Sequence, residues 1–182
     1  RETAVEADLC QIESPALIFD TVEKQLGSVT ALVLSHCHGE YSTIRDTTVE
    51  SFDKHFAVNA RTSWLLVREF GLRLKALTVR GRVVALTSDH VAGNLPYGAS
   101  KGALDRIVLA AAEEFREHRV SATVINPGPT DTGWTTAEQI IEFGRRTPGG
   151  RPGSPEDCAK LVRFLCSDEG GWVNGQLLHS NG

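Results

Sequence analysis

Three side chains that together could move a proton stand close to one another in this sequence, namely Ser88, Tyr97 and Lys101. Tyr97 and Lys101 are four positions apart, so they share one face if this stretch is helical. An ammonium beside a phenol favours the phenolate, and we therefore expect Lys101 to lower the Tyr97 pKa from its usual value of about 10. Tyr97 would then donate or accept a proton near neutral pH, with the Ser88 hydroxyl holding the reacting oxygen.

The elements around these residues predict how they are positioned. Residues 81–87 form a short apolar and β-branched run, which predicts a buried strand with Ser88 at its carboxyl end. Apolar residues then recur at helical spacing, at Leu104, Ile107, Val108, Ala111, Ala112 and Phe115. The small residues Gly98, Ala99, Ser100 and Gly102 are expected to leave the start of this helix open to a ligand. The alternative is an ordinary exposed tyrosine and lysine, because this spacing arises by chance in many helices.

With these residues in view, the chain resembles the short-chain dehydrogenase/reductase family, classical type, and within it the 3-oxoacyl-[acyl-carrier-protein] reductases. The resemblance extends over essentially all of the chain. It implies a Rossmann-like, doubly wound parallel α/β sheet, with residues 1–182 as a single, partial domain. It further implies NAD or NADP as cofactor and a small carbonyl or alcohol substrate. In that frame Tyr97 is the general acid/base, Lys101 also holds the cofactor ribose, and Ser88 orients the carbonyl.

A buried asparagine is predicted on the helix that precedes this region. Thr47 and Glu50 have the spacing of a capping box, and the helix that they open extends to about Leu74. Asn59 falls on its apolar stripe, where an unsatisfied amide costs roughly 1 to 3 kcal/mol. Asn59 is therefore either a structural amide that bonds to backbone or, as the resemblance implies, the residue that binds a water leading protons to Lys101.

Two further stretches are candidates for holding the cofactor. Residues 3–8 read as a short strand, and the resemblance places Asp8 against the adenine, with Leu9 beside it; the alternative is a solvated carboxylate at a strand end. Residues 121–126 predict another strand, followed by a proline- and glycine-rich loop at its carboxyl end, where open α/β sheets bind ligands. The resemblance assigns nicotinamide contacts in this loop to Pro127, Gly128, Thr130 and Thr132. The alternative is a plain connecting loop.

Later elements follow the same order of strands and helices. Thr135 with Glu138 is expected to cap a short helix, and the loop after it resembles the family's mobile lid over the substrate. Ser154 is expected to cap a helix whose inward residues end at Cys166, and residues 175–179 to close the sheet.

The sequence departs from the family in two places. Leu34, Ser35, His36 and Cys37 stand where the family usually carries Asn-Asn-Ala-Gly, and no glycine-rich phosphate turn is found before residue 29. About 50 residues of the fold are therefore expected before Arg1, judged from the size of a β-α-β unit and one further helix. In the strand order 3-2-1-4-5-6-7, residues 3–8 would be the third strand and residues 29–34 the fourth, so they would not be neighbours.

The run His36, Cys37 and His38 raises the alternative of a metal site, because imidazole and thiolate are good zinc ligands. Consecutive residues rarely converge on one ion, and no second matching pair is present, so no metal is predicted. The four cysteines show no Cys-x-x-Cys pattern and are expected to be reduced.

The composition of the chain argues against two classes of binding partner. A net charge of −4 and a pI near 5.9 argue against nucleic acid and membrane surfaces, and no apolar run approaches the roughly 20 residues that span a bilayer. A cytoplasmic location and a homo-oligomer, a dimer or tetramer, are expected. The candidate interface residues are Trp64, Leu65, Leu72 and Val108. The alternative function is a catalytically silent family fragment that acts only in subunit assembly.

Overall fold

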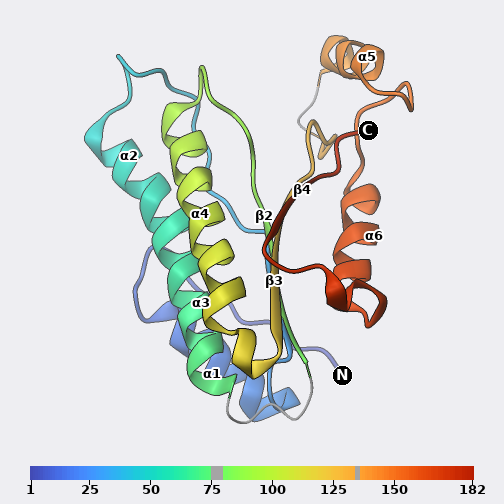
Figure 1. Cartoon of the computed structure of the whole chain (residues 1–182). Coiled ribbons are helices and arrows are strands. Elements are labelled where there is room, and N and C mark those ends of the chain that lie inside the picture. The colour runs from blue at the N-terminus through green and yellow to red at the C-terminus, as the bar shows by residue number, and fades with distance from the viewer. Residues whose placement is uncertain (75–79, 134–135) are drawn as a thin grey trace.

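A parallel sheet forms the centre of the computed structural model, which describes residues 1–74, 80–133 and 136–182. Its strands are β1 (Ala31–Leu34), β2 (Gly81–Leu86), β3 (Val120–Asn126) and β4 (Gln176–His179), in the order β1-β2-β3-β4. All three pairings are parallel, so the carboxyl ends of the strands meet at one edge (Figure 1). The predicted Rossmann-like sheet is confirmed for these strands.

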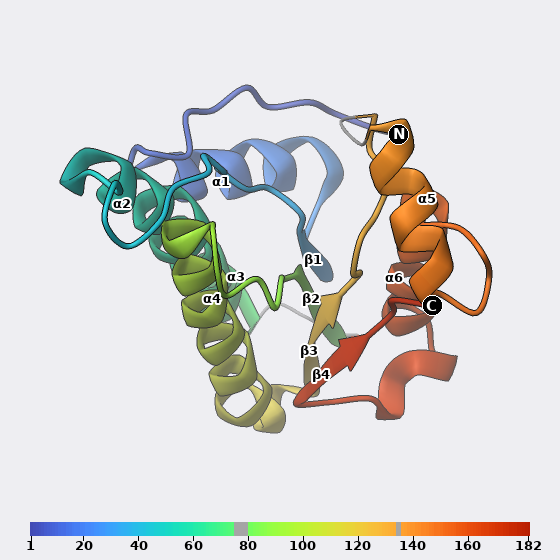
Figure 2. The ribbon, with the colours of Figure 1, turned by 90° about the horizontal axis from the view of Figure 1, so that it is seen from above.

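Helices cover both faces of the sheet. The helices are α1 (Ser14–Leu26), α2 (Val49–His55), the π-helix η1 (Phe56–Arg61), α3 (Thr62–Arg73), α4 (Leu95–Glu114), α5 (Ala137–Arg146) and α6 (Pro155–Cys166), with the short 3-10 helices η3 (Arg116–His118) and η4 (Glu169–Trp172). Figures 1 and 2 show α1, α3 and α4 on one face and α6 on the other. Helix α5 lies beyond the carboxyl edge, above α6.

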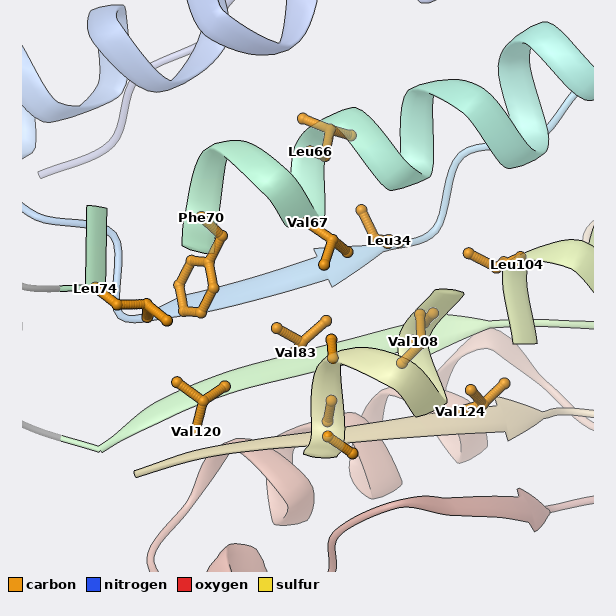
Figure 3. Close-up of a cluster of buried hydrophobic side chains, with 14 of the residues drawn as sticks. Leu34, Leu66, Val67, Phe70, Leu74, Val83, Leu104, Val108, Val120 and Val124 are labelled. Carbon is orange, nitrogen blue, oxygen red and sulfur yellow. The ribbon is translucent and has the colours of Figure 1, made fainter. Parts of the chain in front are cut away.

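Strand alternation explains how one sheet supports two apolar layers. Val83 packs in the cluster on the α3 and α4 side, whereas Val84, the next residue, packs with Ile125 and Leu165 on the α6 side. Figure 3 shows the larger cluster, in which Phe70 of α3 and Val108 of α4 close over the strands. Val108 is fully buried there, so its prediction as an interface residue is wrong.

Three helix starts test the predicted caps. The cap of α2 is Thr48 and not Thr47, since Thr48 Oγ1 accepts the Ser51 N–H at 3.1 Å. The helix thus begins one residue later than predicted, and Thr47 instead bonds within the preceding turn. Ser154 caps α6 as predicted, in a capping box with Asp157.

The cap of α5 is Thr136, in a capping box with Gln139. Thr135, the predicted cap, lies outside the described residues.

The predicted strand over residues 3–8 is wrong, because this segment has no regular structure. A strand is held by its pairing, and no described strand pairs with it. Leu32 pairs with Val83 on one side of β1, and none of the described strands lies on its other side, so Val5 and Leu32 are not hydrogen-bonded as adjacent strands. Strand β1 begins at Ala31, two residues later than expected.

Candidate active site

The end of β2 and the start of α4 bring three of the predicted catalytic residues, Ser88, Tyr97 and Lys101, to the carboxyl edge of the sheet. Lys101 is only 3% exposed, and its Nζ donates to the backbone oxygen of Leu86 at 2.8 Å. Thr87 Oγ1 in turn donates to the Lys101 carbonyl at 3.3 Å. These two bonds fix α4 to the strand that delivers Ser88. The Lys101 ammonium lies 5.8 Å from the centroid of the Tyr97 ring.

Gly98 decides how closely the Ser88 loop approaches Tyr97. A Cβ built at Gly98 would lie 2.0 Å from the backbone oxygen of His90, so only glycine fits there. Ser88 Oγ accepts the His90 N–H at 3.2 Å, which makes residues 88–90 a turn that packs on the first turn of α4. The prediction that Gly98 leaves this helix start open to a ligand is therefore wrong. Gly102 is exposed and a Cβ there would meet nothing within 4 Å, so a ligand at this position stays a prediction.

The expected lowering of the Tyr97 pKa is wrong for the protein without ligands. Burial of the phenol raises the pKa of Tyr97 to about 12, with smaller contributions in the same direction from Cys37 and Tyr41. Burial also lowers the pKa of Lys101, against opposing contributions from Cys37 and Asp105.

Asn59 is fully buried, and each polar atom of its amide is bonded. Its Nδ2 donates to the His38 carbonyl and to Ser100 Oγ, both at 2.9 Å, while its Oδ1 accepts the His38 N–H at 2.7 Å. Ser100 Oγ donates to the Tyr97 carbonyl at 2.8 Å. Asn59 thus joins the loop after β1 to the helix turn of Tyr97. This geometry matches the structural alternative, and a water relay is not tested by it.

The backbone around Asn59 forms a wide turn. In η1 the Thr62 N–H bonds to the Ala57 oxygen, five residues back, in place of the α-helical spacing of four. Ser63 Oγ donates to the Asn59 carbonyl at 2.8 Å. A single α-helix over this stretch is therefore not formed, and the turn that carries Asn59 is set apart from α2 and α3. Wide turns of this kind occur often at functional sites.

The loop after β1, which contains His36, is hydrogen-bonded to the same wide turn. His36 Nε2 lies 3.2 Å from the Val58 carbonyl and 3.2 Å from Ser63 Oγ. Since a carbonyl only accepts, Nε2 carries the proton and donates to it. Burial and the Lys101 charge both lower the pKa of His36, which keeps it neutral at physiological pH. A neutral histidine thus holds the loop after β1 against the wide turn.

Three of the predicted cofactor residues, Pro127, Thr130 and Thr132, line one cavity of about 470 Å³. Its other walls are mainly apolar and come from β1, the end of β2 and α6. Thr130 Oγ1 donates to the Pro127 and Gly128 carbonyls at 3.4 and 3.3 Å. Gly128 has a φ of 61°, and a Cβ there would lie 2.4 Å from the Asn181 Cβ, so glycine is required at this turn. The loop is therefore built to a specific shape at the carboxyl edge.

Asp8 and Leu9 lie away from that cavity, beside the start of α3. The Leu9 carbonyl accepts a hydrogen bond from Thr62 Oγ1. Asp8 Oδ1 accepts the Cys10 N–H at 2.9 Å, and this backbone bond is the main cause that lowers the pKa of the exposed Asp8. Asp8 closes the turn before α1, and a contact with adenine stays a prediction.

Sequence reasoning missed Ser100, His38 and the role of Gly98. Ser100 could have been found, because a serine three residues after Tyr97 lies on the same helix face and is polar on a buried side. His38 contacts Asn59, which is distant in the chain, and Gly98 contacts the His90 carbonyl across the turn before α4. Neither contact can be predicted from the residues next to His38 or Gly98.

Three further features bear on the predictions, namely the cysteines, clusters of metal-ligating side chains and long apolar helices. All four cysteines are free. Within the described ranges, no three histidine, cysteine or acidic side chains are grouped to hold a metal, and no helix is long and apolar enough to cross a bilayer.

Comparison with known proteins identifies relatives along the whole chain. The family model described as enoyl-(acyl carrier protein) reductase matches residues 1–182. The uncharacterized oxidoreductase YjdA of Bacillus subtilis is 33% identical over 98% of this chain and 73% of its own length. The NADPH-dependent aldehyde reductase-like chloroplastic protein of Arabidopsis thaliana is 32% identical over 100% of this chain and 71% of its own length.

A spruce protein and a solved structure agree with these matches. The short-chain type dehydrogenase/reductase of Picea abies is 34% identical over 100% of this chain and 70% of its own length. A solved structure of 4-hydroxyisoleucine dehydrogenase complexed with NADH has the same fold, with a TM-score of 0.84 at 22% identity, and covers 96% of this chain and 77% of that one. From the full-length family match and the identity to these relatives, the protein belongs to the short-chain dehydrogenase/reductase family.

Proposed function

We propose that the protein is an NAD(P)-dependent oxidoreductase that interconverts a carbonyl and a secondary alcohol, with Tyr97 as general acid/base. The observation that carries this proposal is the buried Lys101 ammonium, bonded to the end of β2 and 5.8 Å from the Tyr97 ring. A buried cation next to a buried phenol has little structural benefit, since burial of each is costly. At the ligand-binding edge of a parallel sheet, this pair supports an acid/base role.

The cavity beside Thr130 and Thr132 fits the nicotinamide half of such a cofactor. Its mostly apolar walls suit a flat ring, and the Pro127 loop offers hydroxyl and backbone groups that can bond a carboxamide. When bound, the cofactor supplies or accepts the hydride. Pro127, Gly128, Thr130 and Thr132 would hold the nicotinamide, and Lys101 and Tyr97 the ribose beside it. Asp8 and Leu9 would contact the adenine half.

Four side chains of the protein would carry out proton transfer and orient the substrate. Tyr97 donates its phenolic proton to the carbonyl oxygen during reduction, and Ser88 donates a hydrogen bond that orients that oxygen. Because burial raises the Tyr97 pKa to about 12, the phenol is protonated at neutral pH, which is the form that reduction requires. Lys101 places a positive charge beside the developing phenolate. Asn59 holds the turn of Tyr97 through Ser100 and supports proton return to Lys101.

NADPH and a small carbonyl compound are the first pair to test. The Arabidopsis relative is named as an NADPH-dependent aldehyde reductase-like protein, which supports this choice. Titration of the protein with NADPH and NADH, followed by cofactor fluorescence, should show saturable binding of at least one of them. Turnover should then be measured with a panel of small aldehydes and ketones. Absence of binding by both cofactors would favour the silent assembly role.

Assembly into a homo-oligomer is the second part of the proposal. Trp64 and Leu72 are exposed and line a largely apolar groove of about 580 Å³ between α3 and α4. Leu65, another of the predicted interface residues, is half-buried. We infer that a second copy covers this groove, so that α3 and α4 meet their counterparts. A cytoplasmic location stays a prediction.

A further inference from the structure

Four arginines line a pocket at the end of the sheet opposite to Tyr97. The pocket has a volume of about 450 Å³ and lies at the amino ends of β2 and β3, under η4. Its lining includes Arg80, Arg82, Arg116 and Arg119, together with Trp172. Nothing in the proposed oxidoreductase chemistry uses this pocket, because that chemistry lies at the carboxyl edge.

The register of the sheet explains why the arginines gather. Gly81 pairs with Val120 at the start of the two parallel strands, so the residues just before them, Arg80 and Arg119, are brought together. Helix η3 carries Arg116 into the same connection. Arg82 follows the alternation of β2, and like Val84 it faces the α6 side. The convergence is thus built into the strand pairing.

Arg82 is the most deeply buried of the four arginines. It is 4% exposed, and its Nη1 and Nη2 donate to the Gly81 and Ser167 carbonyls at 3.0 and 3.3 Å. Its Nε is buried and has no hydrogen-bond partner among the residues that the structure describes. The Asp168 carboxylate lies 4.0 Å from Nη2 but is fully exposed, where solvent screens its charge. The buried Arg82 charge is thus balanced only by two carbonyl oxygens and by one carboxylate whose charge solvent screens.

A second guanidinium approaches the same point. A Cβ at Gly171 would lie 2.9 Å from Arg82 Nη2 and 3.3 Å from Arg80 Nη1, so both arginines reach this backbone position. Two like charges that converge in a partly buried place repel each other unless an anion lies between them. Arg116 is paired only at the surface, with Glu113 at 3.0 Å, where both side chains are exposed. The lining of the pocket contains four arginines and no acidic residue.

Trp172 adds an aromatic surface to this cationic pocket. Its side chain is 96% exposed, although a tryptophan loses free energy by staying in water. Guanidinium groups match phosphate oxygens with paired hydrogen bonds, and an indole face suits a flat or apolar group. We propose that this pocket binds a small organic phosphate, with the phosphate on the arginines and the organic part against Trp172.

Phenyl phosphate and inorganic phosphate are suitable probes, and isothermal titration calorimetry is the measurement. Phenyl phosphate should bind more tightly than phosphate, and rising salt should weaken both. Arg80→Gln and Arg116→Gln should each weaken binding by about tenfold, the loss of roughly one charge-assisted hydrogen bond. Trp172→Ala should remove the preference for phenyl phosphate. Arg80, Arg116 and Trp172 are exposed, so these variants should fold, which circular dichroism can verify.

The control variant is Arg145→Gln, which removes an exposed arginine of α5 and should leave binding unchanged. Equal loss in this variant would reveal a general charge effect and overturn the proposal. Phosphate could instead occupy the candidate cofactor site, in which case the Arg80 and Arg116 variants would bind normally and NADPH would compete. Absence of binding, with Trp172→Ala dissociating an oligomer, would show that a second copy covers the pocket and would also overturn it.

Discussion

The backbone oxygen of His90 lies directly against the α-carbon of Gly98, where a Cβ would be 2.0 Å away. This contact presses the turn of residues 88–90 onto the first turn of α4. Ser88 Oγ, which accepts the His90 N–H, is carried with it. The separation of the Ser88 and Tyr97 hydroxyls therefore depends on the absence of one methyl group at Gly98.

Gly98→Ala should lower turnover by tenfold or more, because the added methyl must displace the turn that holds Ser88. Overpacking of this kind should also cost about 1 to 3 kcal/mol of unfolding free energy. Steady-state kinetics and urea unfolding measure the two effects. Gly102→Ala is the matched control, since a Cβ there meets nothing within 4 Å and alanine favours the helix by up to about 1 kcal/mol. Unchanged kinetics in Gly98→Ala would show that the turn is not part of the site.

Tyr97→Phe should lower kcat by about 100-fold or more and leave the affinity for NADPH nearly unchanged, because it removes proton transfer and keeps the ring. Kinetics and cofactor titration separate the two effects. Tyr41→Phe changes the other tyrosine of the chain, which is exposed, and should retain activity. If Tyr97→Phe turns over at the normal rate, Tyr97 has no catalytic role.

The pH dependence of stability should report the buried phenol. Burial raises the Tyr97 pKa from 10.0 to about 12, so the folded protein holds this proton more tightly than the unfolded chain. Its contribution to stability is complete below pH 10 and is lost as the pH rises towards 12. Urea unfolding across this range should show the loss in the parent protein and a smaller one in Tyr97→Phe. Identical profiles for the two proteins would mean that the phenol ionises normally.

Ser100→Ala should lower the unfolding free energy by about 1 to 3 kcal/mol, because it leaves one donor of the buried Asn59 amide without a partner. Urea denaturation measures the change. Ser28→Ala, at an exposed position before β1, should fall within about 0.5 kcal/mol of the parent protein. A loss no larger than that of Ser28→Ala would indicate that Asn59 finds another acceptor.

Leu72→Glu should shift an oligomer towards smaller species, because it places a charge in the apolar groove between α3 and α4. Light scattering coupled to gel filtration at micromolar concentration measures the mass. Ile44→Glu puts the same charge on another exposed apolar residue and should leave the mass unchanged. A monomer in the parent protein would contradict the proposed interface.

The fold could be predicted wherever a segment carries its own pattern. The apolar run at residues 81–87 and the helical spacing after Leu104 identify β2 and α4, and Ser154 with Asp157 marks the start of α6. Residues 3–8 look like a strand, but a strand also needs a partner, which local sequence does not show. The cap at Thr48 lies one position after the predicted one, because the spacing from Thr47 to Glu50 favours the first of two adjacent threonines.

The proximity of Tyr97 and Lys101 could be predicted from the sequence, but the electrostatics of this pair could not. Spacing placed Tyr97 and Lys101 on one face, and this is the arrangement found. The predicted direction of the Tyr97 pKa shift is wrong, because the burial that raises this pKa arises only when the chain packs around the phenol. The Asn59 amide was expected to need partners, and their identities, His38 and Ser100, depend on segments distant in the chain.

The wide turn at Asn59 depends on the number of residues in it as well as on their side chains. Each residue of an α-helix turns the next by about 100°, and η1 absorbs one residue more than an α-helical turn holds, so the extra residue does not rotate α2 against α3. Deleting one residue between Phe56 and Arg61 would therefore allow a regular helix with α2 and α3 in the same relative orientation. The wide turn would then be lost, and with it the position from which Asn59 contacts His38 and Ser100. No substitution of a side chain restores a turn that lacks a residue.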